Sequence, residues 1–286
     1  MAAATFVGRR RGAAAILAVV LKYTAIVAGA FVMVFPFYWM ILSSLREMAL
    51  SFKIPPLFYP TQFLWQNYVA AWTAYPYGRA YINSFIVTAS VVLISLFTTS
   101  LAAYVFAKMR FAGKRLLFPL FLATMMIPFQ VTMIPVYLIV RVLGLYNTLP
   151  ALIIPGALFN ASGVFLLRQF IRGVPGEYND SAYIDGAGYF RIYRSIMLPL
   201  IKTALVSLGI FIFVGVYNDF LMPLILLRDF KNFTVPILLA QMKGIYYTDI
   251  ATSDAAAAIA VVPVIVVYVW AQRYIIEGIA LTGLKA

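Results

Sequence analysis

The stretch NSFIVTASVVLISLFTTSLAAYVF, residues 83–106, contains no charged residue. A helix needs about 20 consecutive apolar residues to cross the hydrocarbon core of a bilayer. The whole chain of 286 residues has the same character, since 64% of it is hydrophobic, 11% is charged and its mean hydropathy is +0.94. Soluble domains carry about 25% charged residues. The composition therefore predicts a membrane protein.

Apolar runs of this kind recur along the chain, at about residues 23–44, 83–106, 116–140, 149–169, 201–225 and 255–276. The alternating segments of about 10 residues that build a membrane barrel are absent from the sequence. We therefore expect an all-α polytopic membrane protein with six transmembrane helices. The chain is expected to form one domain, residues 1–286, with tails at residues 1–22 and at about 277–286.

Basic residues predict the orientation in the membrane. If the N-terminus is cytoplasmic, 15 of the 22 Lys and Arg residues lie on the cytoplasmic side. Because cytoplasmic loops carry an excess of Lys and Arg, both termini are expected inside. The net charge of +13 is attributed to this bias and not to nucleic-acid binding. The start GRRRGAAAILAVVLK, residues 8–22, resembles a signal peptide but leads into a longer apolar run, so the first span is expected to be retained.

Prolines interrupt four of the expected spans. A proline inside a membrane helix frees a backbone carbonyl and bends the helix. The kinks could be ordinary packing irregularities, or they could line a pathway that changes shape. The prolines concerned are Pro128, Pro135, Pro150, Pro155, Pro223 and Pro263. Two longer loops, 46–82 and 226–254, are expected outside. The first should include a short helix, and both could cap the bundle or receive a partner.

The residue types exclude several kinds of chemistry. The chain has no Cys and no His, which removes thiolate chemistry, the commonest general base and the commonest metal ligand. The string FAGKRL around Gly113 and Lys114 lacks the first glycine and the Ser or Thr of a phosphate-binding loop. If ATP drives this protein, another subunit must hydrolyse it.

Ionisable residues inside membrane spans are expensive and point to function. Asp219, in VYNDFLMPL near the end of the fifth expected span, is the clearest case. It could line a path for a polar solute together with Asn218, Tyr217 and Gln130. Alternatively, it could satisfy a backbone donor near Pro223 or pair with an interfacial Arg. A single buried carboxylate is weak support for an ion-coupled carrier.

A polar segment, about residues 173–199, interrupts the apolar pattern between the fourth and fifth expected spans. EYNDSAYI should form a helix, because Glu177 and Asp180 lie where acids favour the helix dipole. DGAG should end that helix, since Gly adopts left-handed geometry. Apolar residues from Phe190 onward then recur at helical spacing up to Pro199. We expect a helix–turn–helix on the cytoplasmic face, either a simple folded loop or a docking element.

The same segment resembles the coupling loop of ATP-binding-cassette importer permeases. Asp180-Ser181-Ala182 stands in the Glu-Ala-Ala positions of that pattern, Asp185-Gly186-Ala187 follows in register, and Leu198-Pro199 closes it. Asp and Ser are departures from the pattern. Further stretches, at 104–118, 125–148, 163–178 and 217–227 and in the C-terminal tail, are similar to the carbohydrate-importer branch of the maltose-permease G-subunit type, although Tyr217 stands where that branch usually has Trp.

The resemblance implies a type I importer permease without a catalytic site, in a bacterial or archaeal plasma (inner) membrane. Its expected partners are a second homologous permease, two ATPase subunits and an extracytoplasmic solute-binding protein. ATP and Mg²⁺ would bind the ATPases, and no cofactor would bind this chain. The residues expected to couple to the ATPase are the eight of the pattern above. The cargo could be a sugar or another solute such as glycerol-phosphate, a polyamine or an amino acid. An ion-coupled secondary carrier is the remaining alternative.

Overall fold

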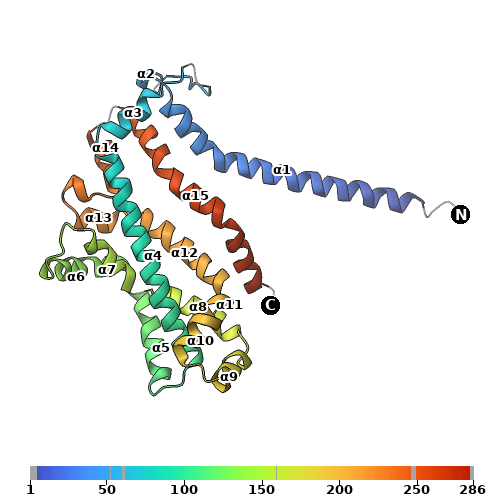
Figure 1. Ribbon diagram of the computed structural model, residues 1–286. Coiled ribbons are helices and arrows are strands. Elements are labelled where there is room, and N and C mark those ends of the chain that lie inside the picture. The colour runs from blue at the N-terminus through green and yellow to red at the C-terminus, as the bar shows by residue number, and fades with distance from the viewer. Residues whose placement is uncertain (1–4, 52, 60–61, 159, 246–248, 284–286) are drawn as a thin grey trace. The chain divides into compact units, whose positions relative to one another are not determined.

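The computed structural model describes residues 5–51, 53–59, 62–158, 160–245 and 249–283, and the regular elements within these ranges are all helices (Figure 1). In this part of the chain, three helices contain continuous apolar spans: α1 (Thr5–Ser44), α4 (Tyr77–Lys108) and α15 (Ile250–Gly283). The spans themselves are Ala15–Ser44, Tyr77–Lys108 and Ile250–Tyr274. The predicted first, second and sixth spans are therefore confirmed, although α1 begins inside the predicted N-terminal tail.

The other apolar regions form pairs of helices that bend at a break. In the first pair, α5 (Lys114–Ala123) and η1 (Thr124–Met126) are bent by 98° from α6 (Phe129–Val142). In the second, α7 (Pro150–Leu158) is bent by 42° from α8 (Ala161–Gly173). In the third, the segment Tyr189–Leu200 is bent by 80° from α12 (Lys202–Tyr217). The described residues contain six spans if each pair counts as one. The interruption predicted at Pro128 in the span 116–140 is confirmed, since the 98° bend lies between Met126 and Phe129. The fifth span likewise ends at Tyr217, before a separate helix α13 (Leu221–Leu226).

Only some of the predicted prolines lie at breaks. Pro128 does, because the residue before a proline disfavours helical geometry and Ile127 is extended, with ψ of 117°. Pro150 is the first residue of α7, a position whose N–H would make no hydrogen bond within the helix, so a proline is tolerated there. Pro135, Pro155 and Pro263 lie inside helices α6, α7 and α15.

The chain divides into two compact units, residues 1–71 with 246–259 and residues 72–245 with 260–286. In the first unit, the segment after α1 folds back on the end of that helix. Asn67 Nδ2 donates to the carbonyls of Ser44 (2.9 Å) and Arg46 (3.0 Å). The short helices α2 (Met48–Ser51) and α3 (Gln66–Thr73) lie in the connection 46–82, where a short helix was expected.

Helix α4 is the centre of the second unit and packs against α7, α8, α12 and α14 (Val235–Ile245) (Figure 1). Its buried face includes small and hydroxyl side chains, among them Ala80, Ser84, Thr88, Ser95, Thr99, Ser100 and Ala103. Such side chains let membrane helices approach closely. A Cβ built on Gly209 of α12 would lie 3.2 Å from Leu96 Cδ1, so α4 and α12 are in tight contact there.

The predicted outer loop 226–254 is largely ordered secondary structure. It contains η3 (Phe230–Asn232), α14 and the first residues of α15, while residues 246–248 lie outside the described ranges. Helix α4 anchors it, because Asn83 Nδ2 donates to the carbonyls of Lys231 (2.9 Å) and Phe233 (3.0 Å). Ser84 Oγ accepts from the N–H of Val235 at 2.9 Å.

A single asparagine binds the α6–α7 connection to this loop. Asn147 has a φ of +62°, a left-handed conformation that Asn tolerates better than most residues. Its Oδ1 accepts from the N–H groups of Arg228 (2.9 Å) and Asp229 (3.0 Å), and its Nδ2 donates to Asp229 Oδ2 (2.7 Å). Its own N–H donates to the carbonyl of Leu226 at 2.9 Å. The two connections are therefore held in one register.

Substitutions of Asn147 should separate the hydrogen bonds from the backbone conformation. Asn147→Gly keeps a residue that adopts positive φ but removes the side-chain bonds, each worth about 0.5–1.5 kcal/mol. Asn147→Ala also forces a Cβ into the left-handed region, for about 1 kcal/mol more. Thermal unfolding in detergent should rank the native chain above Asn147→Gly and Asn147→Gly above Asn147→Ala.

Asn218→Ala is the matched control, because the hydrogen bond that Asn218 Nδ2 donates goes to Val214 in its own helix. It should leave the unfolding temperature nearly unchanged. If Asn147→Gly were as stable as the native chain, the side-chain bonds of Asn147 would not hold the loop.

Candidate functional site

The polar segment folds as the helix–turn–helix expected from its residues. Helix α9 (Glu177–Ile184) carries Glu177 and Asp180 in its first turn. Gly186 has a φ of +76° and donates its N–H to the carbonyl of Tyr183 at 3.0 Å. Ala187 donates to the carbonyl of Ala182 at 2.9 Å, which closes the helix end as left-handed glycine caps do. After this turn the chain continues through α10 (Tyr189–Ile192), a π-helical turn η2 (Tyr193–Met197) and α11 (Leu198–Leu200).

The part of this segment after the turn packs against α4 and α8. Tyr193 is 2% exposed, its hydroxyl lies 2.7 Å from Ser100 Oγ of α4, and its ring centroid lies 5.6 Å from that of Tyr104. Ile192 and Met197 are fully buried in the same cluster, which includes Leu167, Ile171 and Tyr104. Lys108 at the end of α4 donates to the carbonyl of Val174 at 2.6 Å. The segment is therefore a packed extension of these two helices.

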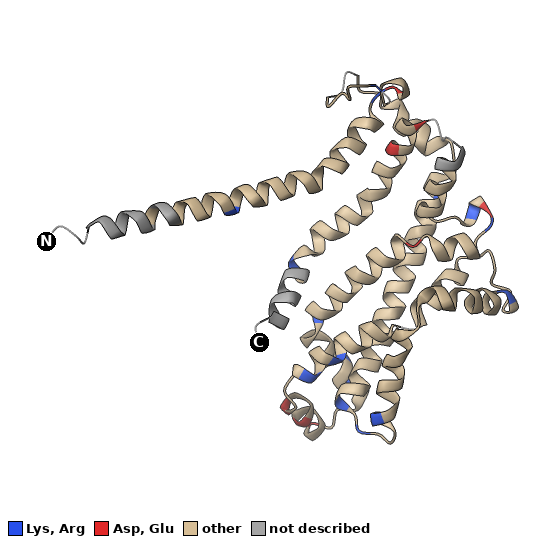
Figure 2. Ribbon diagram, turned by 180° about the vertical axis from the view of Figure 1, so that it is seen from behind, with Lys and Arg blue, Asp and Glu red and all other residues tan. Residues whose placement is uncertain are grey.

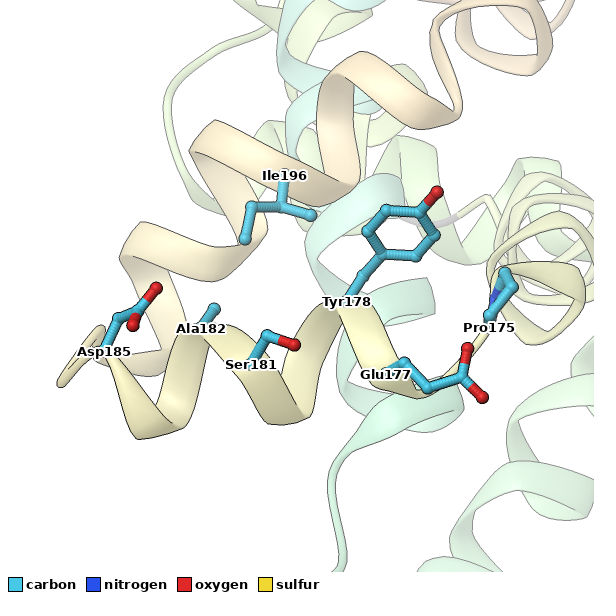
Figure 3. A pocket seen from close by; sticks show the side chains of 7 residues that line it. All are labelled: Pro175, Glu177, Tyr178, Ser181, Ala182, Asp185 and Ile196. Atoms are coloured by element: carbon cyan, nitrogen blue, oxygen red, sulfur yellow. The ribbon is translucent and has the colours of Figure 1, made fainter.

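An accessible groove lies between α9 and the helix that carries Ile196. The groove has a volume of about 440 Å³ and is lined by Pro175, Glu177, Tyr178, Ser181, Ala182, Asp185 and Ile196. Figure 3 shows Ser181, Ala182 and Asp185 on the side of α9 that faces the helix carrying Ile196, whereas Glu177 points away from it. Glu177 and Asp185 line the groove and are exposed, so its rim is polar.

The predicted coupling residues fall into two classes. Asp180, Ser181, Asp185, Gly186 and Pro199 are exposed, and Leu198 and Ala187 are half-buried. Ala182 is 6% exposed and packs into the core cluster, so its small size is required by packing within this chain. One edge of Ala182 also reaches the groove, and its contact with an ATPase stays a prediction.

Sequence reasoning did not select Pro175, Tyr178, Glu177 and Ile196 as site residues. A signal was available for part of the groove, because Tyr178, Ser181 and Asp185 follow one another at intervals of three and four residues, the spacing that puts side chains on one helix face. Asn179 was also missed: it is 6% exposed, and its Oδ1 has no hydrogen-bond partner among the described residues.

Three of the predicted path residues meet at the break between α12 and α13. Tyr217 is 5% exposed and donates to the carbonyl of Ala260 at 3.1 Å, which joins α12 to α15. Asp219 is half-buried, and its Oδ1 accepts from the N–H of Met222 at 3.4 Å, so it caps α13 as the alternative reading expected. Asn218 is exposed. Gln130 lies on a different span, exposed in the first turn of α6.

Within the described residues, no group of three or more His, Cys, Asp or Glu side chains could hold a metal ion. The lining of the groove beside α9 has polar and apolar parts.

Comparison with known proteins gives consistent matches over most of the chain. Residues 95–280 match the family model described as binding-protein-dependent transport system inner membrane component. The arabinooligosaccharides transport system permease protein AraQ of Halalkalibacterium halodurans is 34% identical over 259 residues, which cover 90% of this chain and 92% of the relative. The diacetylchitobiose uptake system permease protein NgcG of Streptomyces coelicolor is 30% identical, covering 91% and 87%. The sn-glycerol-3-phosphate transport system permease protein UgpE of Agrobacterium fabrum is 29% identical, covering 93% and 97%.

A solved structure supports the architecture. A chain in the crystal structure of a bacterial ABC transporter involved in the import of the acidic polysaccharide alginate superposes with a TM-score of 0.80. The match covers 90% of this chain and 96% of the other, at 22% sequence identity, and it confirms the predicted importer-permease fold. This multi-pass membrane chain belongs to the family of inner membrane components of binding-protein-dependent transport systems.

Proposed function

We propose that this chain is the permease subunit of an ATP-driven importer for a sugar or an oligosaccharide. Membership of the family supports the importer assignment, and the names of the arabinooligosaccharide and diacetylchitobiose relatives support the cargo class. A glycerol-phosphate cargo is the second candidate, because the UgpE relatives align over nearly their whole length. The chain would act with a second permease, two ATPase subunits and an extracytoplasmic solute-binding protein.

The observation that carries the mechanism is the packing of the segment 175–200. Its α10–η2 part packs against α4 and α8 through Tyr193, Ile192 and Met197, and an accessible groove lies between that part and α9. A partner that binds α9 and moves would therefore displace α4 and α8 as well, because a close-packed cluster transmits strain. We assign this binding to an ATPase subunit, which would itself bind ATP and Mg²⁺.

The proposed solute path runs past two breaks between helices, at Ile127–Pro128 and at residues 218–220. Irregular backbone at membrane depth is tolerated where it is buried in protein or lines a water-filled cavity. Backbone groups and polar side chains at these breaks would therefore face the solute. The loop bound by Asn147 is the proposed contact for the solute-binding protein. The last residues of the tail, 284–286, which could also reach an ATPase, lie outside the described ranges.

Ser181→Arg should abolish association with the ATPase while leaving the permease folded. Ser181 is exposed at the groove, so an Arg there adds bulk on the partner's side without entering the core cluster. Co-purification of the co-expressed ATPase subunit should fall by about tenfold or more, the effect expected when a central contact is lost.

Ala70→Arg, at an exposed position on α3, is the matched control, and the ATPase subunit should co-purify with it normally. Ala182→Arg should instead lower the unfolding temperature, since Ala182 is buried. Normal ATPase binding by Ser181→Arg would refute docking at this groove.

Asp219 variants should distinguish a helix cap from a path residue. Asp219→Asn keeps an oxygen that can accept from Met222, whereas Asp219→Ala loses the cap at about 0.5–2 kcal/mol. We expect near-normal, ATP-dependent solute uptake in proteoliposomes for Asp219→Asn and a modest loss for Asp219→Ala, smaller than for Ser181→Arg. Loss of uptake by Asp219→Asn in an intact complex would place the carboxylate in the path. Uptake that persists without ATP would indicate a secondary carrier.

A further inference from the structure

Four cations gather where α4, α5 and α8 meet, at the same end of the second unit as α9. They are Arg110, Lys114, Arg168 and Arg172, called here the basic cluster. Lys114 interacts electrostatically with the three arginines, and these are all like charges. Arg168 and Arg172 also repel each other. Figure 2 shows Lys and Arg concentrated at this end of the unit.

Two members of the cluster are held in place in spite of this repulsion. Arg168 Nε donates to the carbonyl of Phe106 at 3.1 Å, and its guanidinium carbon lies 3.9 Å from the centre of the Phe118 ring. Lys114 Nζ donates to the carbonyl of Met109 at 2.7 Å. Because both side chains are already fixed, a ligand would meet little of the ordering cost that binding usually imposes.

Within the described ranges, no salt bridge joins the basic cluster to an acidic side chain, since the one salt bridge there is between Lys231 and Asp229. Asp180 of α9 interacts with Lys108, which is outside the cluster. The hydrogen bonds of Arg168 in the described structure use Nε, which leaves its two terminal amino groups for an external acceptor.

The position of the cluster identifies the kind of acceptor. The membrane span of α4 ends at Lys108, the next begins at Lys114, and α8 ends at Gly173. Side chains at the ends of spans lie at the depth of lipid headgroups. Beside the cluster, Phe111 (38%), Leu116 (65%) and Leu117 (49%) expose apolar surface that acyl chains can cover. Basic sites between helices at this depth suit phosphate headgroups.

We propose that the basic cluster binds the headgroup of an anionic phospholipid, whose acyl chains lie against Phe111, Leu116 and Leu117. Terminal amino groups of Arg168 and Arg172 donate to the phosphate, and Lys114 and Arg110 add attraction as point charges. The bound lipid offsets the repulsion within the cluster and so stabilises the junction of α4, α5 and α8. The inference rests on the chain's place in a membrane and not on the proposed docking at α9.

The test uses the full chain in nanodiscs with equal amounts of phosphatidylglycerol and phosphatidylcholine, followed by transfer to detergent and native mass spectrometry of retained lipid. The native chain should retain phosphatidylglycerol over phosphatidylcholine. Lys114→Gln combined with Arg172→Gln should reduce that ratio about tenfold, since each cation contributes to the attraction. Arg191→Gln combined with Arg194→Gln removes the same charge from exposed positions outside the cluster and should leave the ratio unchanged.

Several outcomes would overturn the proposal. The native chain could retain both lipids equally, in which case the cluster does not select an anionic headgroup. An equal loss in the two double variants would show attraction to net charge alone. An unchanged lipid ratio with loss of ATPase co-purification in the cluster variant would assign these cations to a protein contact. If the cluster variant misfolds, a native ratio that is insensitive to 1 M NaCl during transfer would equally refute a charge-based site.

Discussion

Backbone hydrogen bonding in a medium without water is the constraint on which the rest of this structure depends. Continuous helices satisfy it internally, as α4 does over the whole of its span. At two of the interruptions a short polar side chain accepts a backbone N–H. Asn160 accepts from the N–H of Gly163 at 2.8 Å at the start of α8, and Asp219 accepts from the N–H of Met222 at 3.4 Å at the start of α13. The breaks before α6 and α12 have no such side-chain bond.

The same constraint explains why α4 can organise the second unit. Its buried hydroxyl and small side chains keep neighbouring helices close, and several of them also bind other segments. Ser84 and Asn83 hold the loop near α14 at one end, and Ser100 holds Tyr193 at the other. One rigid helix thus links the loop proposed to meet a solute-binding protein with the segment proposed to meet an ATPase.

Much of the fold and of the site was predictable, and the errors have physical causes. Apolar runs located the spans and Pro128 predicted an interruption inside 116–140, but hydropathy carries no directional information, so the size of the bend, 98°, was not predicted. The helix–turn–helix was predicted from charge placement, a glycine pair and helical spacing. The inward packing of Ala182 was not, because a small residue can face either a partner or its own core. Asn147 was missed for a similar reason, since its partners are some 80 residues away in the sequence.

The sequence by itself determined that the chain is helical and membrane-spanning, that it has no Cys or His chemistry, and that a polar segment interrupts it before the fifth span. These properties follow from composition and local pattern, because partition into a bilayer and helix capping are local free energies. Only the tertiary structure decided that the α10–η2 part of the polar segment packs on α4 and α8 and leaves a groove beside α9. It also brought four cations that are separated along the chain close enough to interact. Both depend on side chains brought together by packing between distant segments, which no local pattern records.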